Sequence, residues 1–548
     1  MKKPNILLIL ADDMGYSDIG CYGGEADTPN LDRLAMNGLR YTQFYNTARC
    51  CPTRASLLTG MNPHQVEMGH MAHFNDDIDG YRGDLSKRCV TIAEVLKEGG
   101  YGTYLSGKWH VCKQQLSTQG DCSNWPLARG FDRFYGIIGG AASFFNPPTL
   151  ARDNESIDPP QDNDYYFTDA VAENACSFIQ DHCQSKEDNP FFLFTSFTAP
   201  HWPLHARQET IDKYRGRFNG GWDKLREQRL ERMIDFGIVK SDTKLTKRDS
   251  TQPAWEDAPD KEWQEKRMEV YAAQIDSMDQ GIGRILNTLE AEGQLDDTLI
   301  FCLSDNGACA EEIFETFYPY DKPAGKGRAK PLTCHPHTKS GELMMHGNDP
   351  AVMPGDETTF QSYGVAWANL SNAPFREYKH FVHEGGIATP LIAHWPAEIA
   401  DQGELRFSTG QLMDIMATVV DVTGVPWPSE RRGRSISQME GESLRASFED
   451  DSVDRPSLAW EHEGNCAFRE GIWKLVKRWD RENWELYDME VDRSELNDLS
   501  AMYSDVLKDL LEKYTRWADR VGVVDWNQLE ANRNARGIST DWMPHPHD

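Results

Sequence analysis

The chain has 548 residues, 39% hydrophobic and 26% charged, which excludes a disordered or fibrous protein and allows one large or two unequal domains. Its 57 basic and 87 acidic side chains give a net charge of −30. Such an acidic surface disfavours nucleic-acid backbones and anionic membranes as partners, although a local cluster of cations can still bind a small anion. Twelve cysteines without a repeated spacing do not form a disulfide-scaffold pattern.

The first apolar stretch predicts a buried strand. It covers residues 6–11 and stops at Asp12-Asp13. A membrane span needs about 20 apolar residues and the core of a secretory signal about 7–15, so the stretch fits neither. We therefore expect no membrane span. The protein is expected to be cytoplasmic, or periplasmic or secreted if an export signal has been removed.

Further apolar runs alternate with helical patterns. The runs lie at residues 5–10, 101–110, 190–203, 298–307 and 388–396. Helices are predicted at residues 28–38, with Thr28 as N-cap and Pro29 in the first turn, and at 277–293 and 418–424, each ending at a glycine. Buried strands that alternate with helices predict an α/β fold, with a large, mostly parallel sheet sandwiched by helices.

Changes in composition divide the chain. Residues 205–265 are highly charged and helical, and we interpret them as a surface excursion. Residues 308–371 are rich in Gly, Pro, His and Thr and have little periodicity, which is typical of a functional loop. Strand patterns at 466–476 and 484–489 then precede a helical pattern at 504–521. The predicted domains are a catalytic domain at 1–445 and a smaller C-terminal α+β subdomain at 446–548, built from a short antiparallel sheet and a helix.

Oxygen-bearing side chains follow two of the apolar runs. Asp12 and Asp13 end the first run, and Asp305 and Asn306 end a later one. Ligands bind outside the carboxyl ends of strands in open α/β sheets, so these side chains are expected to converge. Oxygen ligands favour Ca²⁺ or Mg²⁺ over Zn²⁺. Acidic residues also commonly begin loops, but the repetition after two apolar runs favours a metal site.

Basic side chains occupy other strand ends and turns. A lone lysine or histidine is usually an ordinary surface or core residue. Together with a metal, however, several such groups suit a tetrahedral dianion or monoester whose charge must be neutralised on every face. The set consists of Arg54 in CCPTR, Lys108 and His110 in GKWH, His201 in APHWP, and Lys379 and His383 in YKHFVHEGG.

The stretch at residues 46–60, NTARCCPTRASLLTG, contains two adjacent cysteines. Pro52 is well placed to open a helix, so Cys50 would lie near a helix N-terminus, where anions are favoured. A thiol there could be a nucleophile of low pKa. A thiolate is nevertheless a poor match for a hard, oxygen-coordinated cation, and an oxygen nucleophile would suit the metal better.

This stretch resembles the signature of the sulfatase family, C-x-P-[ST]-R-x-x-L-L-T-G, at every defined position, with Cys51 at the variable one. The family belongs to the alkaline-phosphatase-like superfamily. GKWH, APHWP, LSDNG and K-x-x-x-x-EGG occur in the family's order, and WELYDMEVDRSELNDLS looks like its C-terminal domain. Residues 362–396 are most similar to bacterial arylsulfatases. The resemblance implies that a formylglycine-generating enzyme oxidises Cys50 to formylglycine.

The resemblance also implies a role for each site residue. The Ca²⁺ ligands would be Asp12, Asp13, Asp305, Asn306 and the modified residue 50. One hydroxyl of the hydrated aldehyde would attack sulfur, and the other would help to eliminate sulfate and restore the aldehyde. Arg54 and Lys108 would orient the hydrate, and His110 would assist its deprotonation. His201 and Lys379 would bind sulfate oxygens, and one of them would help to protonate the leaving oxygen.

Two weaker signals remain open. Cys334–His337, CHPH, could indicate a zinc site, but a loop near the mouth of the site fits better because no second Cys/His pair follows at zinc spacing. Trp460, His462 and Glu463 could line the substrate site from the C-terminal subdomain, or could simply pack between the domains.

The expected function is hydrolysis of sulfate monoesters, with aryl sulfates as the first choice of small sulfated substrate. A carbohydrate sulfatase and a phosphonate or phosphodiester hydrolase on the same scaffold are the enzymatic alternatives. A non-catalytic binding protein that descends from a sulfatase is a third. The complete set of site residues argues against that third alternative.

Overall fold

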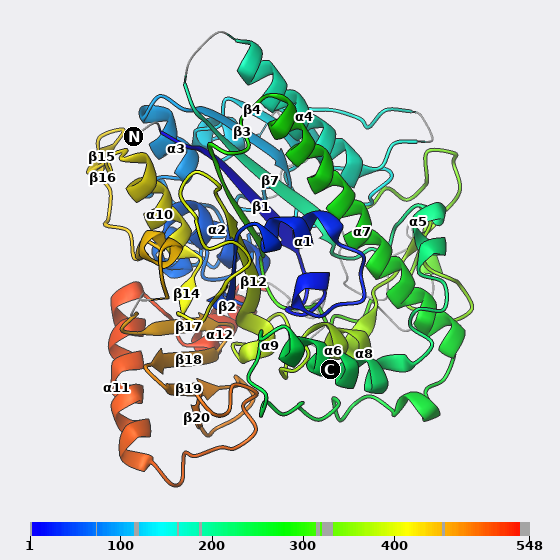
Figure 1. Cartoon of the computed structure of the whole chain (residues 1–548). Helices are drawn as coiled ribbons and strands as arrows, with labels where there is room; N and C mark the ends of the chain where they lie inside the picture. Colours follow the sequence, from blue (N-terminus) through cyan, green and yellow to red (C-terminus); the bar gives the residue numbers. More distant parts are fainter. Residues whose placement is uncertain are drawn as a thin grey trace.

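The computed structural model describes residues 3–72, 74–113, 120–161, 164–185, 189–313, 318–319, 333–451 and 455–537. Its centre is an eleven-stranded mixed sheet covered by helices on both faces (Figure 1). The order is β13 (Leu405–Arg406), β2 (Leu39–Tyr45), β12 (Ala388–His394), β8 (Thr298–Ser304), β1 (Asn5–Asp12), β7 (Phe191–Pro200), β3 (Gly102–Gly107), β4 (Arg133–Ile137), β5 (Leu150–Arg152) and β6 (Glu155–Ser156), with β14 (Gly410–Gln411) paired to β2. This confirms the predicted fold class.

Alternation along β1 explains why the sheet is sandwiched. Ile6, Leu8 and Leu10 face one hydrophobic core, and Leu7 and Ile9 face the other. A strand that is buried on both faces must be apolar throughout, as β1 is. The first core is shared with α2 (Cys50–Thr59), α3 (Ile92–Glu98) and α10 (Met413–Thr423), and the second with α1 (Pro29–Met36), α4 (Phe167–Gln184) and α7 (Lys261–Ala291).

The parallel part of the sheet positions the site. β1 pairs in parallel with both β7 and β8, and β7 pairs in parallel with β3. The carboxyl ends of these four strands therefore meet at one edge, and each is followed by a residue of the predicted site. Asp12 ends β1, and the other three follow their strands directly: Asp305 after β8, His201 after β7 and Lys108 after β3.

The C-terminal part is a separate layer. It is a four-stranded antiparallel sheet of β17 (Leu458–His462), β18 (Asn465–Glu470), β19 (Trp473–Lys477) and β20 (Glu485–Asp488). Helix α11 (Ser504–Val521) lies along this sheet, at the lower left of Figure 1, and buries Leu510 and Tyr514 against it. The helix α12 (Trp526–Ala535) follows. The predicted antiparallel sheet and helix are thus present, while the boundary at residue 446 stays a prediction.

The remaining elements are short or peripheral. They are α5 (Gln208–Lys213), α6 (Gly221–Asp235), α8 (Gly364–Ser371), α9 (Glu384–Ile387), β9 (Tyr318–Pro319), β10 (Met345–His346), β11 (Thr359–Phe360), β15 (Glu430–Arg431) and β16 (Arg434–Ser435). Most of the predicted loop at 308–371 is described, but residues 314–317 and 320–332 lie outside the described residues. None of the helices in the described ranges is long and apolar enough to cross a membrane.

The structure corrects two predictions about helices. The helix predicted to start at residue 277 is the second half of α7, which begins at Lys261. The charged segment at 205–265 is not a simple surface excursion, because α6 buries Trp222 and Arg229. Arg229 is held inside by Asp18, at 2.8 Å, and by Glu25, at 2.7 Å. A buried arginine is tolerated when carboxylates pair with it, and charge patterning along a sequence does not reveal such partners.

Candidate active site

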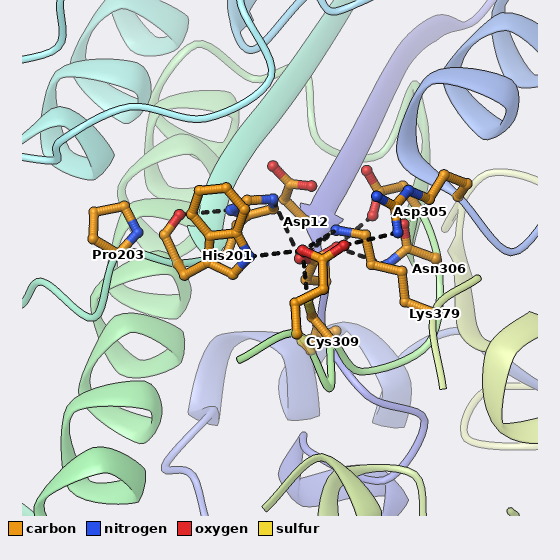
Figure 2. A network of polar contacts seen from close by, with 12 residues as sticks. Asp12, His201, Pro203, Asp305, Asn306, Cys309 and Lys379 are labelled. Atoms are coloured by element: carbon orange, nitrogen blue, oxygen red, sulfur yellow. Dashed lines mark hydrogen bonds and ion pairs between the residues drawn. The ribbon is translucent and has the colours of Figure 1, made fainter. Parts of the chain in front are cut away.

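Three carboxylates and one amide from two strand ends lie close together. The backbone N–H of Asp13 donates to Asp305 Oδ1 at 3.1 Å, and Asn306 Nδ2 donates to Asp13 Oδ1 at 2.7 Å. Asp12 and Asp305 are both fully buried. Figure 2 shows Asp12, Asp305 and Asn306 grouped at the end of the strand, with His201 and Lys379 approaching from opposite sides.

Two of the predicted bases neutralise the acids on one side. Lys108 Nζ donates to Asp12 Oδ2 at 2.6 Å. Arg54 reaches Asp305 Oδ2 through both Nε, at 3.1 Å, and Nη2, at 2.9 Å. Its Nη1 donates to the Lys108 carbonyl at 3.1 Å, so the guanidinium also fixes the strand end that carries Lys108.

Asp13 is the meeting point of the other two bases. Lys379 Nζ donates to Asp13 Oδ2 at 2.8 Å, and His201 Nε2 lies 3.3 Å from the same oxygen. Burial alone would raise the pKa of Asp13, but His201 and Lys379 outweigh it and hold that pKa below its usual range. Burial lowers the pKa of His201 to about 4, whereas Asp13 keeps the pKa of Lys379 well above its ordinary value.

Cys50 is the first residue of α2, as expected from Pro52 in the first turn of the helix, and its side chain is buried. A hydrogen bond with Cys51, followed by the charges of Lys108 and His110, outweighs burial and holds the pKa of the Cys50 thiol well below its usual range. His110 Nε2 lies 3.2 Å from Cys51 Sγ, and burial lowers the pKa of His110 to about 4. The ligand atoms of Cys50, Cys51 and His110 lie within 4.8 Å of one another, so the predicted nucleophile position adjoins His110.

The His110 ring has its place because the facing residue is a glycine. A Cβ atom on Gly140 would lie 2.4 Å from His110 Cε1 and Nε2. His110 itself has a positive φ of 57°. Non-glycine residues rarely adopt this backbone region, and those that do cluster at functional sites.

The donor set fits a hard divalent cation. Asp12 Oδ1 and Asn306 Oδ1 are buried and make no hydrogen bond. Burial and the neighbouring Asp12 charge raise the pKa of Asp305 to about 8. Crowded carboxylates and unsatisfied oxygens are both relieved by a cation that takes oxygen ligands, as Ca²⁺ and Mg²⁺ do.

The structure also places the residues of the weaker signals. His383 is buried and its Nε2 lies 3.3 Å from Glu485 Oε2, so it joins the two sheets and stays outside the group around Asp13. Cys334 packs in a small apolar cluster that contacts Trp202, which places the CHPH segment beside the site. Trp460 donates from Nε1 to the Asn46 carbonyl at 2.9 Å, a contact typical of packing between the sheets.

The sequence analysis missed two groups of contacts. Glu463 Oε1 lies 2.5 Å from His70 Nε2 and its Oε2 2.6 Å from His380 Nδ1, which attaches the β17–β18 turn to the residue after Lys379. Glu311 forms an ion pair of 2.8 Å with Arg49, the residue directly before Cys50. A sequence signal was present for Glu463, which was already a candidate beside Trp460 and His462, and for Arg49 and His380, because each adjoins a predicted site residue. Glu311 and His70 follow no spacing rule.

Comparison with known proteins identifies the enzyme class and the family of this chain. A sequence model of the sulfatase family matches residues 4–425, and one for the C-terminal region of N-sulphoglucosamine sulphohydrolase matches residues 376–519. Together with the mixed sheet and the acids and bases at its strand ends, these matches define an enzyme of the sulfuric ester hydrolase class. The chain belongs to the sulfatase family.

Relatives that match most of the length of this chain are also sulfatases. An uncharacterized sulfatase of Schizosaccharomyces pombe is 32% identical over 95% of this chain and 95% of its own. The arylsulfatase of Klebsiella aerogenes is 33% identical over 81% of this chain and 92% of its own. Among solved structures, Ps i-CgsB in complex with k-i-k-neocarrahexaose has a TM-score of 0.65 at 22% identity and covers 98% of both chains, which supports the fold.

Proposed function

We propose that the chain hydrolyses sulfate monoesters through a formylglycine formed from Cys50 and a bound Ca²⁺, with Mg²⁺ as the alternative ion. One observation carries this proposal: Asp12, Asp13, Asp305 and Asn306 converge at the end of β1, while Lys108 and Lys379 pair with two of those same acids. The site thus offers carboxylates to a hard cation, and basic side chains to the sulfate group that this cation would polarise. When bound, the cation supplies Lewis acidity and lowers the pKa of the nucleophile.

The basic side chains have different roles because they lie at different positions in the site. Lys108 and Arg54 lie beside residue 50 and hold its oxidised, hydrated form in place. His110, kept neutral by its lowered pKa, is able to accept a proton at a ring nitrogen when the aldehyde is restored. The hydrated aldehyde itself supplies an attacking oxygen and a second hydroxyl for elimination of sulfate, which a serine could not provide.

Lys379 and His201 serve the leaving group. Both contact Asp13 Oδ2, on the side of the site that does not carry Arg54 and Lys108. Lys379 keeps its proton through the neutral range, whereas His201 is neutral there. Lys379 Nζ therefore supplies both the positive charge and the hydrogen bond beside the ester oxygen. The neutral His201 ring donates from Nδ1 to the Trp202 carbonyl at 2.6 Å, which keeps Nε2 on the side of Asp13.

Aryl sulfates are the first choice of substrate, supported by the similarity to the Klebsiella arylsulfatase. Carbohydrate sulfates are the second candidate, favoured by the paired Arg49 and Glu311 next to the site. The proposed partner in maturation is a formylglycine-generating enzyme.

The test combines mass spectrometry with kinetics. The peptide that contains residue 50 should lose about 18 Da when –CH₂SH becomes –CHO. The fraction of modified chains should then scale with turnover of 4-nitrophenyl sulfate, and turnover of an aryl phosphonate should be lower. Cys50→Ala should abolish turnover, while Cys302→Ala, at another buried cysteine within β8, serves as the matched control. Full turnover by unmodified chains, or preferred cleavage of the phosphonate, would contradict the proposal.

A further inference from the structure

Three histidines surround one carboxylate away from the acids around Asp13. His70 Nε2 lies 2.5 Å from Glu463 Oε1, and His462 Nε2 lies 3.4 Å from the same oxygen. His380 Nδ1 lies 2.6 Å from Glu463 Oε2. All four side chains are buried, with 0% to 3% of their surface exposed. We call this set of His70, His380, His462 and Glu463 the histidine cluster.

The histidine cluster joins three segments that are far apart in the sequence. His70 lies after α2, His380 lies between α8 and α9, and His462 and Glu463 lie where β17 turns into β18. Asn465 Nδ2 donates to the carbonyls of His462, at 3.1 Å, and His380, at 3.4 Å, and so ties two of these segments together. A group bound in the cluster therefore contacts both the catalytic part of the chain and the C-terminal sheet.

Several polar atoms of the cluster have no hydrogen bond. Within the part of the chain that the structure describes, the ring nitrogens of His70 and His462 and the Oε1 atom of Glu463 make none, although all are buried. Buried polar atoms in folded proteins nearly always have a partner. A neutral imidazole carries a lone pair on one nitrogen, and an ionised carboxylate carries lone pairs on both oxygens. The cluster thus brings together lone pairs that no described donor uses.

The simplest alternative is a carboxylate that accepts hydrogen bonds from the imidazoles. The contacts of His70 and His462 with Glu463 Oε1 do not have hydrogen-bond geometry, however, although the first is only 2.5 Å long. Two lone-pair atoms at that distance repel each other. A cation that both atoms bind removes the repulsion and holds them about 3.3 Å apart, as tetrahedral bonds of about 2.0–2.1 Å require.

The protonation states suit a metal as well. Burial lowers the pKa of His70 to about 4 and also lowers the pKa of His462, so both rings are neutral at neutral pH. Burial alone would raise the pKa of Glu463, but the imidazoles around it, that of His380 first, outweigh burial and hold that pKa well below its usual range. Neutral imidazoles and ionised carboxylates are the forms that bind metal ions.

The backbone of the cluster has an uncommon conformation. His380 and Glu463 have positive φ angles of 90° and 50°. Non-glycine residues rarely adopt this region, and those that do cluster at functional sites. The His70 ring is stacked on Trp526 of α12, with ring centroids 5.4 Å apart, which fixes its orientation.

The types of ligand decide between metals. Ca²⁺ and Mg²⁺ take oxygen ligands, whereas imidazole suits Zn²⁺ and its neighbours among the transition metals. One ligand atom from each of His380, His462 and Glu463 lies within 4.8 Å of the other two, and His70 supplies the fourth ligand beside Glu463 Oε1. Four protein ligands make a closed site, which is the structural kind of zinc site, whereas a catalytic one keeps a position open.

We propose that the histidine cluster binds a structural Zn²⁺ ion that fastens the C-terminal sheet to the catalytic part of the chain. This ion is distinct from the cation at the end of β1, because it takes imidazole nitrogens in place of oxygen ligands. The proposal does not depend on the reaction that the enzyme catalyses, and a chain without sulfate ester turnover would still bind the ion.

Metal titration of the full chain tests the site. The protein is stripped with a chelator and kept in excess Ca²⁺, which occupies the oxygen ligands around Asp12. The unchanged chain should then retain about one Zn²⁺ ion after desalting, measured by elemental mass spectrometry. Its melting temperature should rise by about 2 °C at a Zn²⁺ concentration 100 times the Kd. Co²⁺ in place of Zn²⁺ should give intense visible absorption bands, because a tetrahedral site has no inversion centre.

Variants locate the ion. Glu463→Gln and His462→Ala should each weaken Zn²⁺ binding at least about 100-fold, since each removes a direct ligand. His64→Gln is the matched control, because His64 is also buried and its Nε2 lies 2.7 Å from Glu461 Oε2, outside the cluster. It should bind Zn²⁺ as the unchanged chain does, and so should Asp305→Asn, which alters the catalytic acids.

Three results would overturn the proposal. The first is an unchanged chain that retains no Zn²⁺ after desalting, and the second is a Co²⁺ spectrum with only the weak bands of a six-coordinate ion. Both are measured on the unchanged chain, so a variant that fails to fold does not affect them. The third is loss of Zn²⁺ in Asp305→Asn with retention in Glu463→Gln, which would assign the ion to the catalytic acids.

Discussion

Lys379 Nζ and Asp13 Oδ2 form a buried ion pair of 2.8 Å between residues 366 positions apart. Asp13 follows the central strand β1, and Lys379 lies in the segment between α8 and α9. The pair joins two groups that the sequence suggested separately, the acids for a metal and the bases for an anion. A buried charge pair of this kind is weak evidence for stability, but its position beside Asn306 and His201 agrees with the role in the reaction that we propose for Lys379.

Replacing Lys379 by methionine tests that role. The variant keeps an unbranched side chain but loses its charge beside the ester oxygen, so kcat/KM for sulfate esters should fall about 100- to 1,000-fold. Lys247→Met, at an exposed position, should have no such effect. Steady-state kinetics on the modified enzyme measure both. A loss of less than tenfold would show that Lys379 does not serve the leaving group.

Removal of the metal is expected to abolish activity and lower the melting temperature. A cation that binds only the folded chain stabilises it by about 2.7 kcal/mol at 100 times its Kd, so the melting temperature should rise with added Ca²⁺ after chelation. Asp305→Asn should lose this dependence. Asp296→Asn, at an exposed position before the same strand β8, should retain it. If the melting temperature of the unchanged chain were the same with and without added Ca²⁺, the result would contradict the metal site.

Stability should decrease in mild acid because of buried histidines such as His205. Its Nε2 donates to the Thr359 carbonyl at 2.6 Å, and its Nδ1 accepts from the Phe144 N–H at 3.4 Å. Burial lowers the pKa of His205 to about 4, against an ordinary 6.5. The neutral ring therefore contributes fully above pH 6.5, and its contribution is lost as the pH falls toward 4. The shift is equivalent to about 3 kcal/mol over that window.

The measurement is urea unfolding at pH 7.5 and pH 4.5. His205→Gln can make both hydrogen bonds without titrating, so its loss of stability on acidification should be smaller than that of the unchanged chain. His337→Gln, at an exposed site, should lose as much as the unchanged chain does. Identical pH dependence in all three proteins would show that His205 is not the responsible group.

The sequence supplied the fold class and the convergence at the strand ends because both follow from local patterns. Asp12 and Asp305 each terminate an apolar strand, and parallel strands bring their carboxyl ends to one edge. Pairings across the chain were not accessible in this way. Neither the Asp13–Lys379 contact nor the Arg49–Glu311 contact has a sequence spacing that predicts it, because loops of arbitrary length connect the partners. The resemblance to the sulfatase family implied roles for Asp13, Lys379 and the residue next to Arg49, but it did not give the distances between these side chains.

The interface between the two sheets depends on Lys474. Its Nζ donates to Glu384 Oε1 at 2.9 Å and to Glu495 Oε1 at 2.8 Å, and all three side chains are fully buried. Glu384 begins α9, five residues after Lys379, so the lysine of β19 anchors the segment that carries Lys379. Lys474→Met leaves two buried carboxylates short of a counter-charge and should cost about 3–5 kcal/mol in the free energy of unfolding.

The double variant Lys474→Met/Glu495→Gln should be less destabilised than Lys474→Met alone, because one of the stranded charges is removed together with its partner. Lys477→Met, three residues further along β19 and partly exposed, is the matched control and should change stability by less than about 0.5 kcal/mol. Because Glu384 is close in sequence to Lys379, the single variant should also lower kcat/KM for sulfate esters below the melting transition. Denaturant unfolding and kinetics on the same preparations check both effects, and a Lys474→Met chain of unchanged stability would show that the interface does not need this charge.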